Sequence, residues 1–215
     1  MKSKVVLLLA FSASLAAAQT ADFKVFIKGK PAGTVRSTFS SGKTGYVEDS
    51  KGSLTQNGQS MKINTRTELS ASGNWKLKLM EATANGRTIK ATATPKGHGA
   101  HVVIEGGGAK PLSRDVPKKT KTTTADATAK WFRGYTPKPG ESAKYQRFDM
   151  NAMNWTDVTY RYIGPKDVTL QGKTRSGFAI EREENGVKSI LIIEQGGMPI
   201  LYDSPDMRME RIYPK

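Results

Sequence analysis

From residue 19 onward, short runs of alternating apolar and polar residues dominate the chain. In ADFKVFI (21–27), Phe23, Val25 and Ile27 fall on one face, with Lys24 and Lys28 on the other, and DVTYRYI (157–163) has the same period of two. Such alternation is typical of strands that bury one face. Asn85-Gly86 and Asn185-Gly186 are strong hairpin signals between such runs. The pattern therefore predicts an all-β protein with an antiparallel sheet.

The strand-like runs fall into two groups within what we expect to be one domain. Residues 19–108 and 141–215 are each predicted to form a β-meander, and residues 109–140 a connector. One face of most strands is polar, which favours a curved antiparallel sheet or half-barrel over a sandwich. SILIIE (189–194) is the only fully apolar run, so we expect it at the centre of the sheet. The sequence leaves open whether the two meanders form one continuous sheet.

The connector is rich in proline, lysine and threonine, as exposed linkers often are. TADATAKWF (124–132) predicts one short helix with Thr124 as its N-cap and a stop at Gly134. Two interpretations of the residues that follow remain open. They form a basic, aromatic binding surface, or their rings anchor the helix end to the sheet, which we favour because apolar rings usually pack. The surface would consist of Lys130, Trp131, Arg133 and Tyr135.

The N-terminus has the pattern of a secretory signal peptide, for which we assign residues 1–18. Lys2 and Lys4 precede an apolar run at 5–15, and three alanines end at Ala18, where we expect cleavage. The apolar run is too short to span a membrane, and no later segment is apolar enough. The sequence therefore predicts a periplasmic or secreted protein without a transmembrane segment.

Composition excludes several kinds of chemistry. The chain has no cysteine, so thiol nucleophiles, disulfides and cysteine-ligated metals are ruled out. The formal net charge of +15 predicts attraction to anionic components of a cell envelope. Nucleic acid is a poor partner for an exported chain that shows no nucleic-acid-binding motif. No cofactor is expected.

The only two histidines are the remaining place to look for catalysis. His98 and His101, with Glu105, could form part of a metal site, but strand residues three apart point to opposite faces. No G-x-S-x-G motif is present. We therefore expect neither a metal site nor an enzyme, although a hydrolase that uses His98 or His101 remains an alternative.

Two non-catalytic functions fit these observations. The first is a structural or interaction module of the cell envelope, whose basic surface meets anionic partners. The second is a periplasmic carrier that binds a lipid or another apolar ligand on the concave face of the sheet. That face would be lined by Trp75, Leu77, Leu79, Tyr160, Tyr162, Ile190 and Ile192.

Two segments carry a resemblance to known proteins. FKVFIKGKPAGTVRSTF (23–39) and WFRGYTPKPGESAKYQRFD (131–149) resemble a diffuse family of uncharacterised, exported bacterial β-rich domains. These domains are in turn similar to the region that precedes the catalytic core of bacterial transglutaminase-like proteins. The resemblance implies a non-catalytic accessory or binding module and transfers no functional residues. A weaker likeness, to lipoprotein-carrier half-barrels, implies a curved sheet that holds acyl chains.

Overall fold

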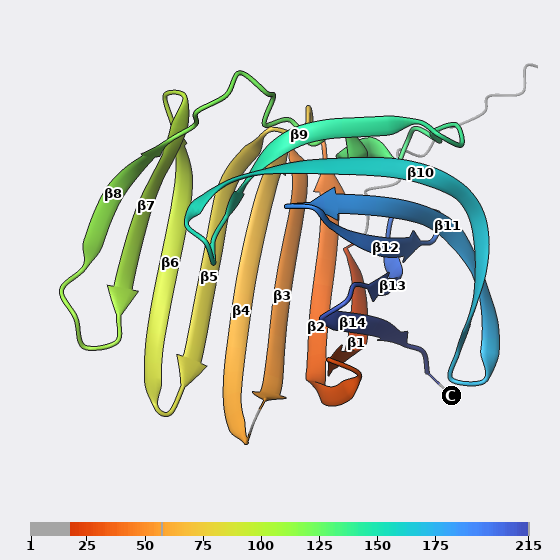
Figure 1. The fold of residues 1–215 in the computed structure, drawn as a ribbon, viewed down its shortest axis with the longest axis horizontal. Helices are drawn as coiled ribbons and strands as arrows, with labels where there is room; N and C mark the ends of the chain where they lie inside the picture. The colour runs from red at the N-terminus through yellow and green to blue at the C-terminus, as the bar shows by residue number, and fades with distance from the viewer. Residues whose placement is uncertain (1–17, 57, 215) are drawn as a thin grey trace, which may run out of the picture.

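The computed structural model describes residues 18–56 and 58–214, which form fourteen strands and one short 3-10 helix (Figure 1). The first meander contains β1 (Gln19–Ile27), β2 (Lys30–Gly42), β3 (Gly45–Gln56), β4 (Gln59–Ser70), β5 (Trp75–Ala84), β6 (Arg87–Lys96), β7 (Gly99–Gly106) and β8 (Leu112–Pro117). The helix η1 (Ala127–Lys130) follows. The second meander contains β9 (Ser142–Asp149), β10 (Asn154–Leu170), β11 (Lys173–Glu184), β12 (Val187–Ile193), β13 (Pro199–Asp203) and β14 (Met207–Ile212).

All fourteen strands belong to one antiparallel sheet, in the order β8-β7-β6-β5-β4-β3-β2-β1-β14-β13-β12-β11-β10-β9. Within each meander, consecutive strands pair, and β1 pairs with β14, so that Phe23 lies opposite Arg211. This pairing joins the two meanders into one continuous sheet. The sheet is not closed, because β8 and β9 are its two edges. The predicted all-β, antiparallel fold class is confirmed.

The sheet curls so that its second half lies over its first. In Figure 1, β9 and β10 cross the ends of β3 to β5. Trp75 of β5 stacks on Phe148 of β9, with 6.2 Å between the ring centroids, and Trp155 of β10 meets Phe148 edge-on at 5.4 Å. The Trp155 indole N–H also donates to the Val116 carbonyl of β8 at 3.1 Å. Aromatic packing therefore holds the curl in place.

A bulge in β10 explains why β12 is apolar on both faces. The pairing of β10 with β11 shifts between Tyr162 and Gly164, and such bulges bend a strand. Beyond the bulge, Leu170 packs against Ile192. The other face of β12 packs against a separate cluster through Ile193. The expectation that SILIIE lies at the centre of the sheet is wrong, because β12 is the fourth strand from the β9 edge. Its hydrophobicity reflects two covered faces instead.

The connector is more structured than the sequence suggested. It begins with the edge strand β8, and its helix is a single 3-10 turn capped by Asp126 rather than by Thr124. Trp131 and Phe132 are 3% and 1% exposed and pack on the second meander. Phe132 stacks on Phe178 with 4.2 Å between the ring centroids. The rings therefore anchor the connector.

The predicted signal peptide lies almost entirely outside the described residues, which include only Ala18 of it. Across residues 18–56 and 58–214, no helix has the length and hydrophobicity needed to cross a membrane.

Candidate functional site

The first meander has an inner face, which we define as the face that carries Trp75, Lys78 and Val102 and meets β9. A bulge decides which residues of β5 lie on it. Leu69 pairs with Trp75, but the preceding residue of β4 pairs with Leu77, so the register shifts by one. Trp75 and Lys78 therefore share the inner face, whereas Leu77 and Leu79 lie on the outer face. The predicted common face of Trp75, Leu77 and Leu79 is wrong for this reason.

The other residues expected to line an apolar concavity lie in two separate clusters. Tyr162 is buried together with Trp131 and Phe132, and Tyr160 packs against that cluster. Ile192 belongs to the cluster with Leu170, against which Ile190 packs. Neither cluster contains Trp75, which packs with Val102 and Phe148. The structure does not bring the seven residues together on one surface.

The residues of the proposed basic, aromatic surface also separate. Trp131 is buried, whereas Lys130 is exposed. Tyr135 is 48% exposed, and its hydroxyl donates to Glu141 at 2.7 Å. Only Arg133 of this group reaches a cavity.

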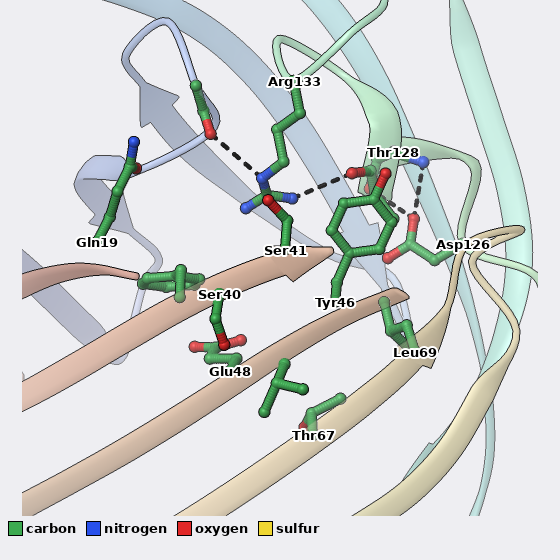
Figure 2. A pocket seen from close by; sticks show the side chains of 14 residues that line it. Gln19, Ser40, Ser41, Tyr46, Glu48, Thr67, Leu69, Asp126, Thr128 and Arg133 are labelled. Atoms are coloured by element: carbon green, nitrogen blue, oxygen red, sulfur yellow. Dashed lines mark hydrogen bonds between the residues drawn. The ribbon is translucent and has the colours of Figure 1, made fainter. Parts of the chain in front are cut away.

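That cavity, of about 520 Å³, lies between the first meander, the connector and the turn between β12 and β13 (Figure 2). Its floor is formed by the ends of β2, β3 and β4, and its roof by η1 and the residues around it. Charged, polar and apolar groups share its walls. The residues that line it include Phe39, Tyr46, Glu48, Thr67, Leu69 and Arg133.

The Arg133 side chain extends from the connector to the turn between β12 and β13 and lies above Tyr46 of the first meander. Its guanidinium donates three hydrogen bonds of 3.2 Å, to the carbonyl oxygens of Ala129, Gly196 and Gly197. It lies 5.7 Å from the centre of the Tyr46 ring. Burial lowers the pKa of Arg133, while nearby Glu48 opposes that shift. The side chain is therefore a fixed positive charge in the cavity.

Glu48 places a carboxylate in the same cavity. On β3 it pairs with Phe39 of β2 and with Thr67 of β4. Its only side-chain hydrogen-bond donor among the described residues is the Ser50 hydroxyl, at 3.5 Å. Glu48 is exposed to solvent in the open cavity, yet desolvation by the surrounding protein raises its pKa, against the influence of Arg133. No sequence pattern pointed to Glu48, because polar residues occupy both faces of β3 around it.

Lys78 is the inner-face residue of β5 opposite Thr67. Its ammonium donates to the Phe148 carbonyl oxygen of β9 at 2.8 Å. Desolvation, with a smaller contribution from Arg147, lowers the pKa of Lys78 to about 8. A lysine that titrates so near neutrality is an unusual element of a fold interior.

Beyond the cavity, the inner face stays polar on β2 to β4, where Ser37, Ser50 and Thr65 pair in a row, and becomes apolar from β5 onward. Two residues further along the strands, Met80 pairs with Ala91, which in turn pairs with Ile104. Ile104 pairs with Leu112, which is 50% exposed, and Ile89 on the same face is 48% exposed. Successive inner-face residues lie about 7 Å apart along a strand. This apolar strip therefore starts about 7 Å from the row that contains Glu48, Thr67 and Lys78.

The histidines lie elsewhere. His101 Nδ1 is 2.6 Å from Asp115 Oδ1, and His101 Nε2 is 3.3 Å from the Ser113 hydroxyl. This is the order of groups in a hydrolytic triad. Ser113 and Asp115, however, are exposed on the outer face at the edge of the sheet. They line neither the cavity beneath Arg133 nor the hollow beside β9 and β10. Lys96 also binds Asp115. His98 lies in the turn before β7, and the described residues contain no cluster of potential metal ligands.

A second hollow, of about 410 Å³, lies on the other side of β9 and β10. Its walls are almost entirely polar and include Lys144, Asp157 and Glu183. The amide oxygen of Gln146 is buried there without a hydrogen-bond partner among the described residues. Trp155 is the one aromatic residue among those that line it.

Comparisons with known proteins assign no family to this chain. No family description and no curated protein sequence matches it. A solved structure, of a DUF1089 family protein from Pseudomonas aeruginosa, is similar to it with a TM-score of 0.42 and 11% sequence identity. The match covers 92% of this chain and 95% of that one. No function is transferred from so distant a likeness.

Proposed function

We propose that this chain is an exported, non-catalytic binding protein of the cell envelope that holds an amphipathic, lipid-like ligand. The polar end of the ligand occupies the cavity beneath Arg133, and its apolar part lies along the inner face toward Met80 and Ile104. The observation that carries the proposal is the continuity of these two regions on one face, through paired residues of adjacent strands.

The composition of the cavity supports an amphipathic ligand rather than a purely apolar one. Its volume of about 520 Å³ is in the range of small-molecule sites. Arg133 and Glu48 supply charge at one end, while Phe39 and Leu69 supply apolar contact. Half-exposed Ile89 and Leu112 give the inner face apolar surface that an acyl chain would cover. The proposal thus refines the carrier function expected from the sequence.

A test is to express the protein from its full sequence, purify it without detergent and analyse extracted lipid by mass spectrometry. Thr67→Phe fills the cavity from its floor, and Thr88→Phe makes the same change at an exposed position. The wild type and Thr88→Phe should carry an amphiphile, while Thr67→Phe, if equally stable, should lose it. Absence of any bound amphiphile, or its full retention by Thr67→Phe, would contradict the proposal.

The surplus of positive charge favours a second candidate, an interaction module that meets anionic envelope polymers. Exposed carboxylates such as Asp22, Asp49 and Asp115 already form ion pairs with Arg36, Arg66 and Lys96. Cleavage after Ala18 removes Lys2 and Lys4 and no acidic residue, so the exported chain has a formal charge of 15 − 2 = +13 with which to meet such partners. This function predicts retention on isolated envelope material that falls as salt is added. Retention that ignores ionic strength would argue against it.

A further inference from the structure

We propose that the polar end of the ligand is zwitterionic, with an anionic group held by Arg133 and an ammonium group held by Glu48. This inference rests on the proposed function, because it assigns the chemistry of the ligand in the same cavity. The two side chains come from different elements and project toward the same space (Figure 2).

Arg133 is prepared to bind an anion. Three of the five N–H donors of a guanidinium are used by the carbonyl oxygens of Ala129, Gly196 and Gly197, so two remain. The three bonds fix the position of the group before a ligand arrives, which lowers the entropy lost on binding. A phosphate or carboxylate oxygen is the natural acceptor for the remaining donors.

Glu48 supplies the complementary charge. Neither Glu48 nor Arg133 forms an ion pair within the described part of the chain, although both line one cavity. The anchoring of Arg133 to backbone carbonyls keeps its guanidinium away from the carboxylate. The ring of Phe39, the cross-strand neighbour of Glu48, adds an aromatic surface that favours an ammonium group.

The remaining charges near the cavity select against ligands of a single sign. An anion alone would meet the carboxylate of Glu48 as well as the guanidinium of Arg133. A cation alone would meet Arg133 and the nearby ammonium of Lys78. Asp126 also lines the cavity and adds a negative charge that, like that of Glu48, favours the charged form of Arg133, while its Oδ1 caps η1 by accepting from the Thr128 N–H and hydroxyl. A zwitterion satisfies both of the charges that have no partner.

Two sources provide this chemistry, a phosphoethanolamine lipid headgroup and a free amino acid. Each carries a primary ammonium close to an anionic group. They differ in their apolar part, because only the lipid reaches the strip formed by Met80, Ile104 and Leu112. The experiment therefore includes both.

The test is isothermal titration of the protein with dihexanoyl-phosphatidylethanolamine, its phosphatidylglycerol counterpart, which lacks the ammonium, and leucine. The wild type should bind the ethanolamine lipid about tenfold or more tightly than the glycerol lipid, the scale of one charge-assisted hydrogen bond. Glu48→Gln should remove this preference, and Glu105→Gln, at an exposed position of β7, should keep it. Arg133→Lys should weaken both lipids equally. In the wild type, the preference for the ethanolamine lipid over the glycerol lipid should grow as the pH rises through the pKa of Glu48, because only the ionised carboxylate attracts the ammonium group.

Equal binding of the two lipids by the wild type, or a preference that survives in Glu48→Gln, would overturn the zwitterion inference. The proposed function would still hold if Thr67→Phe abolished binding of both lipids. If neither lipid binds, the lipid-like ligand is overturned, and the zwitterion inference then stands only if leucine binds in a Glu48-dependent manner. Leucine binding assigns the site to a free amino acid, whereas binding of the ethanolamine lipid alone assigns it to a lipid headgroup.

Discussion

Replacement of Lys78 by methionine tests the electrostatics of the fold interior. Methionine has a similar length and no charge, so the substitution removes a desolvated ammonium. Folding moves the pKa of Lys78 from 10.5 to about 8, which at 1.36 kcal/mol per unit corresponds to about 3 kcal/mol lost by the charged form on folding. Loss of the hydrogen bond to the Phe148 carbonyl offsets about 1 kcal/mol of this gain. Partial access of water to Lys78 reduces it further, so we expect Lys78→Met to stabilise the protein by about 1–2 kcal/mol at pH 7.

The sign of the pH dependence follows from proton binding. The unfolded chain keeps the Lys78 proton up to its ordinary pKa, whereas the folded chain loses it near pH 8. Between these two pKa values the unfolded state binds more protons than the folded state. The free energy of unfolding of the wild type therefore increases as the pH rises through this range. The advantage of Lys78→Met should therefore be full below pH 8 and should disappear by about pH 10.5.

Urea unfolding, followed by tryptophan fluorescence at pH 7 and pH 10, measures both quantities. The matched control is Lys90→Met on the exposed surface of β6, for which we expect a change below about 0.5 kcal/mol at either pH. A Lys78→Met protein that is less stable than the wild type at pH 7, or whose advantage is the same at pH 10, would show that the Lys78 ammonium does not destabilise the folded state.

Three further predictions concern packing and chemistry. Phe132→Ala should lower the free energy of unfolding by about 3–5 kcal/mol, because the ring is 1% exposed and anchors the connector; a loss below 1 kcal/mol in chemical unfolding would show that the anchor is dispensable. Gly177→Ala should cost about 1–3 kcal/mol, because its Cβ would lie 2.7 Å from Ile192 Cγ2, whereas Gly134→Ala meets no neighbour; equal melting temperatures for the two variants would contradict this. Replacing His98 and His101 together by alanine should leave lipid binding unchanged in titration, and a tenfold loss would place the histidines at the site.

The sequence predicted the strands because burial of one face leaves a visible alternation. The prediction from alternation was wrong where a bulge changes which face a residue occupies. The bulge in β5 places Trp75 and Leu77 on opposite faces of the sheet. Nothing in the alternation of residues 75–79 reveals the extra residue. The apolar run of β12 was recognised, but its cause, the folding of the end of β10 over it, depends on a bulge more than twenty residues earlier in the chain.

The candidate site was hidden for a related reason. Glu48 and Arg133 are 85 positions apart in the sequence and meet only because the sheet curls and the connector crosses it. Arg133 was noticed for its aromatic neighbours, yet its role follows from three carbonyl contacts that the sequence does not reveal. Glu48 stands among polar residues of both faces, so no local pattern distinguishes it from a solvated carboxylate.

Native mass spectrometry of the protein with dihexanoyl-phosphatidylethanolamine shows whether the cavity and the adjoining inner face hold an amphiphile. We expect one bound lipid per chain for the wild type and for Thr88→Phe, and none for Thr67→Phe. If the wild type binds no lipid, or if all three proteins bind it equally, the cavity is not the binding site of an amphiphile.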